Sequence, residues 1–530
     1  MDIRLKNIGS LWLACLLATA GLAKDLDDRT LLDSVKNKDR AAVRSLLRAG
    51  APVNTRGADG ATALHWAAHR DDLETAKLLL SVGADVNAAD DYGVTALSLA
   101  CTNRNAEMVG MLLKAGANPN AAELSGETVL MTCARAGSLE AVRLLLAHHA
   151  DVNAKESRRG QTALMWAAWQ KHHAVVQELV EYGADVNARS HGLPRDDCFM
   201  VNPMDLDLKQ AGNMRIAGSG VPYICAKYVE GGFTPLLFTA QQGDVASARI
   251  LLVAGADVNQ GSLDGMNPLL LASASGHEAF AIFLLEQGAD PNAADRYGLT
   301  ALHYALQKGI TPLRGAIFEP GMAHLYPPTM PELVKALLAH GANPNAQIAK
   351  DLPRLIIQWK PRMGLVGATP FLIAAAATDV NLMRVLLAGG ADPLLATKDK
   401  TTPLIVAAGV GWAEDRPAGQ DKNALEAVRL ILEMGADANT ANASGHTALH
   451  GAAYTGNNPV VQFLADKGTN LNAKDMNGQT PLDVAEGLAP KGSYSVTPPP
   501  VHKETADLLR KLGASSGLVP ISQTEVIGPD

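Results

Sequence analysis

The chain has little of what nucleic-acid-binding proteins usually carry. Aromatic residues make up 4% of its 530 residues, the net charge is −8, and no block of lysine and arginine stands out. A protein that follows a phosphate backbone needs such a basic block. The composition therefore argues against a nucleic-acid partner.

Motifs for catalysis and for metal binding are also missing. The sequence has no glycine-rich phosphate loop, no paired-histidine zinc motif, no nucleophile elbow and no Cys-x-x-Cys. The pairs His148-His149 and His172-His173 would chelate poorly, because neighbours on a helix point about 100° apart. We therefore expect a protein that is not an enzyme and that has no cofactor and no metal site.

One unit is repeated along most of the chain. Each copy has a turn glycine, then Thr-(Ala/Pro)-Leu-x-x-Ala, then a leucine-rich stretch closed by Gly-Ala-Asp-x-Asn. The turn positions lie mostly 33 residues apart, and Lys400 takes the place of one glycine. A period in the low thirties is typical of stacked units that cannot bury their apolar faces alone. Such an array predicts a protein whose surface binds another molecule.

Each unit predicts two short antiparallel helices. A threonine, or Asn267 in one copy, stands where a side-chain oxygen caps the first helix. A proline often follows at the first helical position, which can spare its N–H. The second helix ends at a glycine suited to the left-handed backbone conformation. His149 departs from this rule, and we expect it to cost some local stability.

Two signatures of the unit resemble those of the ankyrin repeat. They are Thr-Ala-Leu-His-Trp-Ala-Ala at 62–68 and Gly-Ala-Asp-Val-Asn at 83–87. The resemblance implies an all-α repeat solenoid, elongated and curved, of helix-turn-helix units joined by β-turn fingers. About twelve units run from Leu26 to Ala514. The signature histidine is kept at His65, His303 and His450.

The boundaries of the array follow from the repeats. We expect a signal peptide at 1–23, the array at 24–514 and a flexible tail at 515–530. Insertions interrupt the array near 189–231, 309–329, 346–366, 409–421 and 487–500. The insertions at 189–231 and 346–366 lie on the finger side of the repeats, which in ankyrin-like proteins borders the face used for partners. Long loops of this kind are either functional or disordered.

The N-terminus has the pattern of a secretory signal. Arg4 and Lys6 precede a nearly uncharged apolar stretch, Ile8–Ala20, and small residues suit cleavage after Ala23. The stretch is shorter than the roughly 20 residues that span a bilayer, which weighs against a membrane anchor. A lipoprotein would use Cys15, but the usual leucine three residues before it is absent. We expect a periplasmic or secreted protein with no membrane span after cleavage.

Export permits disulfides, and four cysteines remain in the mature chain. Cys198 and Cys225 both lie in the 189–231 insertion, and we predict a bridge between them. Cys101 and Cys133 fall at the Ala-Ala positions of adjacent first helices, where a small apolar residue is wanted. We expect these two to be buried thiols.

Apolar residues gather at the positions that we expect to face a partner. In ankyrin-like repeats the residue after the turn glycine is usually exposed on the concave surface. Consecutive repeats place Phe233, Met266 and Leu299 there, with Tyr297 nearby and Trp169 at the exposed end of a first helix. A contiguous apolar patch of this kind marks an interaction site. The apolar 189–231 insertion either covers this stripe or extends the binding surface.

These features together predict a monomeric scaffold, of the exported bacterial type of ankyrin-repeat protein, that binds a protein partner on its concave surface. Two alternatives stay open. A secreted effector would act on targets outside the cell. An accessory subunit would bind a metal or another ligand through its insertions.

Overall fold

The computed structural model describes residues 31–200, 214–216, 222–306, 329–350, 364–410, 420–488 and 501–518. The chain divides into two units, which we treat separately. Unit 1 comprises Met1–Leu193 and Gly231–Asp257, and unit 2 comprises Pro194–Glu230 and Val258–Asp530.

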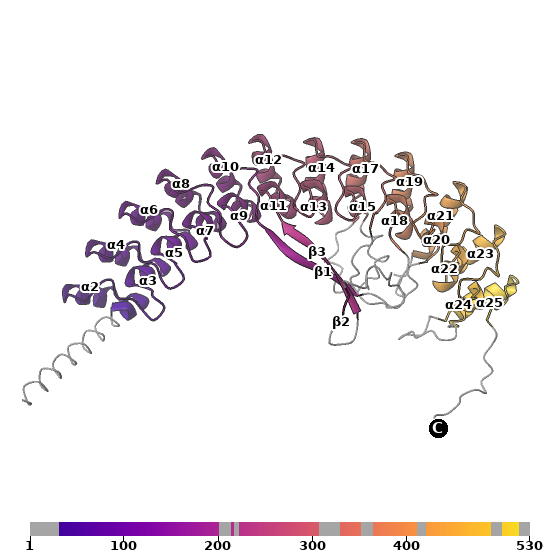
Figure 1. Cartoon of the computed structure of the whole chain (residues 1–530), viewed down its shortest axis with the longest axis horizontal. Helices are drawn as coiled ribbons and strands as arrows, with labels where there is room; N and C mark the ends of the chain where they lie inside the picture. Colours follow the sequence, from indigo (N-terminus) through magenta and orange to yellow (C-terminus); the bar gives the residue numbers. More distant parts are fainter. Residues whose placement is uncertain are drawn as a thin grey trace, which may run out of the picture. The chain divides into compact units, whose positions relative to one another are not determined.

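Unit 1 is built from helix pairs that stack on one another. In Figure 1 the first helices α3, α5, α7, α9 and α11 form one row, and the second helices α4, α6, α8, α10 and α12 form another. Helical residues 31–36 pair with α2 at the start of the stack. The helix bounds are α2 Arg40–Arg48, α3 Ala63–His69, α4 Leu73–Ser81, α5 Ala96–Thr102, α6 Ala106–Lys114, α7 Val129–Ala136, α8 Leu139–Ala147, α9 Ala163–Trp169, α10 His173–Glu181, α11 Pro235–Gln242 and α12 Val245–Val253.

Unit 2 continues the same plan of first and second helices. Its helices are α13 Pro268–Ala274, α14 Glu278–Glu286, α15 Ala301–Ala305, α17 Pro331–Ala339, α18 Pro370–Ala376, α19 Val380–Ala388, α20 Pro403–Ala407, α21 Gln420–Glu433, α22 Ala448–Tyr454, α23 Asn458–Asp466, α24 Pro481–Ala485 and α25 Lys503–Lys511. The described residues of the two units thus form twelve helix pairs, which confirms the predicted repeat solenoid.

Local sequence explains where these helices begin and end. Thr162 accepts a hydrogen bond from the backbone N–H of Met165 at 3.4 Å, and Asn267 does the same for Leu270 at 2.8 Å. Proline occupies the start of the first helix in five repeats, as predicted. His149 and Lys400 have φ of 64° and 62°, so both non-glycine residues take the left-handed conformation that glycine has in the other repeats.

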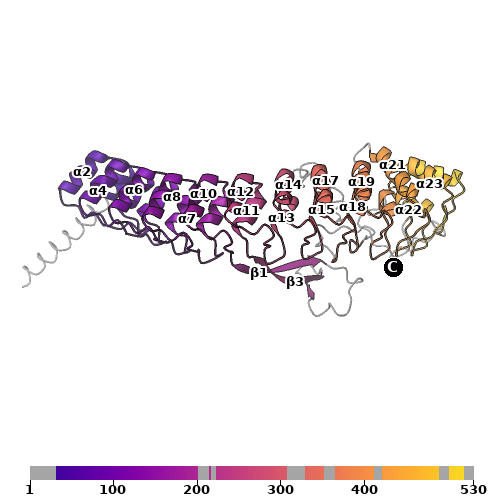
Figure 2. The ribbon, with the colours of Figure 1, turned by 90° about the horizontal axis from the view of Figure 1, so that it is seen from above.

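A ladder of asparagines fastens most repeats to the next on the finger side, and Leu394 stands where one of these asparagines would be. The side chain of Asn54 donates to the carbonyl of Gly83 at 3.1 Å and accepts from the N–H of Asp85 at 2.7 Å. Asn187 makes the same pair of bonds to Gly255 and Asp257, at 3.1 Å each, although an insertion separates them. The insertion therefore leaves the register of the stack unchanged. Figure 2 shows the finger loops of unit 1 along one side of its helix rows.

The 189–231 insertion contains a three-stranded sheet in the order β1-β3-β2 (Figure 1). The strands are β1 Gly192–Met200, β2 Met214–Ile216 and β3 Pro222–Gly231, and β2 pairs antiparallel with β3 so that Arg215 lies opposite Tyr223. Cys198 and Cys225 lie on the neighbouring strands β1 and β3. Their side chains are outside the described ones, so their bridge stays a prediction.

The cysteines of the helix stack differ from expectation. Cys101 and Cys133 form a disulfide between α5 and α7, with their Cα atoms 4.7 Å apart. Our expectation of two buried thiols was right about burial, since both cysteines are fully buried. It was wrong about their oxidation state, since they form a disulfide. The alanine-rich helices approach so closely that cysteines at these two positions come within bonding distance.

The ends of the chain are described in part. Ser515, Ser516 and Gly517 hydrogen-bond to Asn472 and Asp483, and 519–530 lie outside the described residues. The signal peptide expected at 1–23 lies outside them too, as do 307–328, 351–363, 411–419 and 489–500 within the predicted insertions. None of the helices in the described ranges is long and apolar enough to cross a membrane.

Candidate partner-binding face

Two positions on each first helix of unit 1 define a common surface. Counted from the capping residue, they are the fourth and the seventh, and Lys36 stands at the seventh position of the incomplete first repeat. We call this surface the first-helix face. Its residues are Lys36, Trp66, His69, Leu99, Thr102, Thr132, Arg135, Trp166, Trp169, Phe238 and Gln241.

Neighbouring repeats interlock on the first-helix face by a simple rule. At three junctions of unit 1, the seventh residue of one repeat contacts the fourth residue of the next. Lys36 Nζ lies 4.7 Å from the centre of the Trp66 ring, and the Arg135 guanidinium lies 5.6 Å from that of Trp166. The ring of Trp169 lies 5.6 Å from that of Phe238. Cations held over tryptophan rings in this way are favourable contacts, of about 0.5–1 kcal/mol where exposed.

An aromatic cluster forms where the sequence placed part of the predicted site. Trp169 is 37% exposed and its ring meets Phe238 nearly edge-on, at an angle of 68°. The ring of Phe233 lies 5.5 Å from that of Phe238. The structure thus joins the predicted residues Trp169 and Phe233 through Phe238, which is 4% exposed. Sequence reasoning overlooked Phe238, although its place at the fourth helix position was a sufficient signal.

The other predicted site residues belong to unit 2. Leu299 is only 5% exposed, so the expectation that the residue after the turn glycine is exposed is wrong there. The reason is that the turn folds over it while its N–H binds Asp295 at 2.8 Å. Met266 is half-buried, with its Sδ 4.0 Å from the hydroxyl of Tyr304.

Tyr297, the last of these residues, is half-buried and joins the finger of its own repeat to the finger of the next. Its ring lies 4.7 Å from the Arg296 guanidinium, and its carbonyl accepts hydrogen bonds from the N–H groups of Ala349 and Lys350, at 2.8 and 3.1 Å. The predicted stripe therefore divides, with Phe233 in unit 1 and Met266, Tyr297 and Leu299 in unit 2.

A carboxylate orients the arginine of the first-helix face. Glu127 accepts from the Arg135 guanidinium at 2.7 Å and from the Thr132 hydroxyl at 3.1 Å. The pair is partly exposed, so it adds at most about 1 kcal/mol to stability. Burial and the nearby charge of Glu127 raise the pKa of Glu123. The hydrogen bond to Glu127 and the contact with the Trp166 ring together hold the Arg135 side chain in place.

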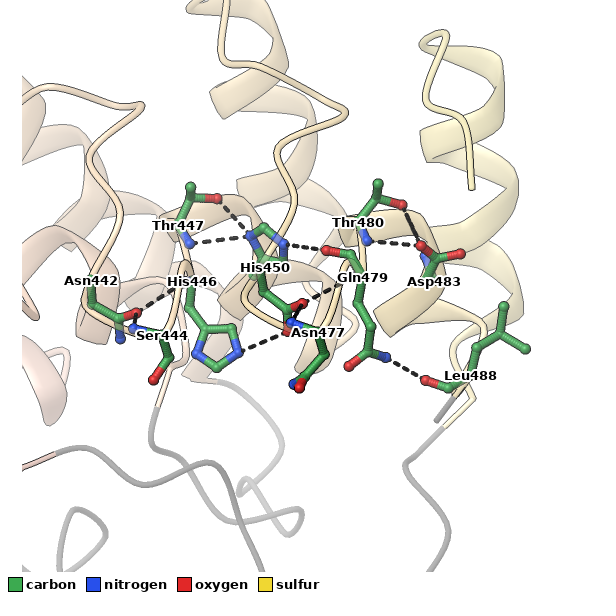
Figure 3. Close-up of polar contacts among 11 residues, drawn as sticks. Asn442, Ser444, His446, Thr447, His450, Asn477, Gln479, Thr480, Asp483 and Leu488 are labelled. Atoms are coloured by element: carbon green, nitrogen blue, oxygen red, sulfur yellow. Dashed lines mark hydrogen bonds and ion pairs between the residues drawn. The ribbon is translucent and has the colours of Figure 1, made fainter. Parts of the chain in front are cut away.

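Unit 2 contains a polar network that fastens repeats together, shown in Figure 3. Nδ1 of His450 accepts from the N–H of Thr447 at 3.2 Å, and Nε2 lies 3.2 Å from the carbonyl of Gln479 in the next repeat. In the neutral tautomer both contacts are hydrogen bonds. Burial lowers the pKa of His450 to about 4, which keeps the ring neutral. The histidine therefore joins two repeats.

His446 lies in the same network (Figure 3), and its Nε2 is 3.4 Å from Oδ2 of Asp475. Asp475 is buried, and its Oδ1 accepts from the N–H groups of Asn477 and Gln479 at 2.8 and 2.9 Å. Burial lowers the pKa of His446 despite the nearby carboxylate. These contacts hold a finger loop in shape. Across the described part of the chain, no three His, Cys, Asp or Glu side chains gather as a metal site would require.

Comparisons with known proteins agree on one family. The family model described as ankyrin repeats (3 copies) matches residues 31–123, 115–190, 236–348 and 418–492, more than half of the chain. The chain is similar to mouse ankyrin repeat and SOCS box protein 16, with 34% identity over 173 residues, covering 29% of this chain and 37% of that protein.

Two further relatives cover different shares of the chain. The mouse B-cell lymphoma 3 protein homolog is 31% identical over 213 residues, covering 34% of this chain and 44% of that protein. The Neurogenic locus Notch protein of Drosophila melanogaster is 35% identical over 147 residues, covering 24% of this chain and 5% of that protein. The chain thus spans less than half of the length of these relatives.

Proposed function

Because the chain belongs to the ankyrin repeat family, we propose that it is a non-enzymatic scaffold that holds a protein partner on the first-helix face of unit 1. The observation that carries this proposal is Trp169, a large aromatic side chain 37% exposed on top of a buried phenylalanine. Tryptophan on a packed base is the residue most enriched at the energetic centre of protein interfaces.

The rigidity of the face favours binding. Its helices are packed through fully buried alanines such as Ala67, Ala68 and Ala167, and the asparagine ladder fixes the finger loops. Side chains that are already held in place lose little entropy when a partner docks. The contacts that hold Arg135 and Trp169 before binding therefore support a preformed surface.

The disulfide supports the proposed compartment. Disulfides persist in oxidising environments such as the periplasm or the extracellular space. The Cys101–Cys133 bridge and the secretory pattern of the N-terminus both favour export. We accordingly place the scaffold, as a monomer, in the cell envelope or outside the cell.

Affinity capture from an envelope extract of the producing cells tests the proposal. The bait is the full chain, and the variant is Trp169→Ala. Tyr182→Ala is the matched control, because Tyr182 is 48% exposed at the end of the second helix α10 of the same repeat. We expect a partner that is retained by the parent and by Tyr182→Ala and lost from Trp169→Ala at unchanged melting temperature. Equal capture by both variants would contradict the proposed face.

A further inference from the structure

Unpaired basic side chains follow the first-helix face along its edge. The turns that join first and second helices carry Lys38, Arg104 and Lys171 at one equivalent position. In the second repeat this position is Asp71, and Arg70 comes directly before it. All four basic side chains are exposed. Each lies within three residues of the seventh helix position, so the cations border the first-helix face.

The basic side chains of this edge are not held in ion pairs, although Asp39 follows Lys38 and Asp71 follows Arg70. Within the described ranges of unit 1, none of these four side chains makes an ion pair. The acid at the equivalent position, Asp71, accepts a hydrogen bond from Asn105 and stands next to Arg70. A basic edge is notable on a chain whose net charge is −8.

We infer that the first-helix face of unit 1 selects an extended, acidic segment of a protein partner. The inference rests on the proposed function and adds the chemistry of the ligand. Carboxylates of the segment would meet Lys38, Arg70, Arg104 and Lys171, while its apolar side chains pack on the tryptophans. Opposite charges across an interface set specificity and association rate.

The spacing of the repeats fits such a segment. Packed neighbouring helices are about 8–10 Å apart. An extended chain advances about 3.3 Å per residue, so it crosses one repeat in about three residues. A carboxylate at every third residue would therefore meet one repeat after another. Because the cations stand at most one to a repeat and the chain has no block of lysine and arginine to follow a phosphate backbone, the face favours a peptide over a nucleic acid.

Binding of labelled peptides to the full chain, measured by fluorescence anisotropy, tests the inference. The probe is a peptide of about 15 residues with the repeat Glu-Leu-Ser, and its control has Gln in place of Glu. We expect the Glu peptide to bind roughly tenfold more tightly than the Gln peptide, and its advantage to shrink as salt is added.

Charge reversal at the edge supplies the matched variants. Arg104→Glu with Lys171→Glu should remove the preference for the Glu peptide. Arg48→Glu with Lys114→Glu, which makes the same charge change on exposed residues of the second helices α2 and α6, should keep it. Melting temperatures of both double variants verify folding.

Three results would overturn the inference: equal binding of Glu and Gln peptides, an equal effect of both double variants, or equally tight binding of a single-stranded oligonucleotide of the same charge. These outcomes are separate from the proposed function. A partner captured through Trp169 but indifferent to Arg104→Glu with Lys171→Glu would keep the scaffold and remove the acidic ligand.

Discussion

Replacing both cysteines of the Cys101–Cys133 bridge by alanine isolates the contribution of the cross-link. The two residues are 32 positions apart, and in the chain-entropy description a loop of that length stabilises the fold by roughly 3.7 kcal/mol. Alanine is a suitable replacement because other repeats hold Ala67-Ala68 and Ala167-Ala168 at these positions. Loss of the two buried sulfur atoms adds a packing cost on the order of 1 kcal/mol.

Urea unfolding followed by circular dichroism measures the effect without reductant. We expect Cys101→Ala with Cys133→Ala to lower the free energy of unfolding of the segment that contains α5 and α7 by roughly 5 kcal/mol. Reductant should then destabilise the parent far more than the double variant. Any response left in the variant would report the bridge that we predict between Cys198 and Cys225.

Two results would refute this reasoning. The first is that parent and double variant unfold at the same urea concentration in the absence of reductant. The second is that Cys101 and Cys133 of the unreduced, denatured parent are both alkylated, as seen by peptide mass mapping. Either result would show that the bridge does not form in the protein.

Three further changes have expected outcomes. Burial lowers the pKa of His303 and of His450 to about 4, below the ordinary value of 6.5. Each histidine therefore stabilises the fold fully above pH 6.5 and loses that contribution as the pH falls toward 4. The free energy of unfolding measured in urea should fall over this range by roughly 3 kcal/mol per histidine, and His450→Leu should remove the part of this pH dependence that His450 contributes. His149→Gly should raise the free energy of unfolding by about 1 kcal/mol, because His149 is exposed with φ of 64°. Thr378→Gly should raise the thermal midpoint by an amount equivalent to about 1–2 kcal/mol, because Thr378 has φ of 51° and its buried hydroxyl lacks a hydrogen-bond partner among the described residues. An unchanged midpoint in either glycine variant would contradict the assignment of backbone strain.

Local chemistry explains why so much of the fold was predictable. A capping threonine, a proline after it and a closing glycine act within a few residues, so the sequence of each repeat determines where its helices begin and end. The pattern held even where the residue type changed, as at His149 and Lys400, which adopt the glycine conformation. Stacking of similar units then extended the local prediction to the whole array.

Features that depend on the offset between repeats were harder to predict. Cys101 and Cys133 stand at different positions of their helices, and only the geometry of the stack shows that these positions face each other. The contact of Trp169 with Phe238 also joins different positions of neighbouring first helices, here across an insertion. Leu299 shows the converse error, because its position suggested exposure while the turn covers it.

Site-specific photo-crosslinking tests whether the partner docks on the first-helix face of unit 1. A photoreactive residue placed at Thr102, exposed on the first-helix face, is compared with one placed at Lys114, exposed on the second helix α6 of the same repeat. In an envelope extract of the producing cells, we expect a specific crosslinked protein from Thr102 and none from Lys114. Crosslinking from Lys114 alone would place the partner on the opposite row of helices and contradict the account.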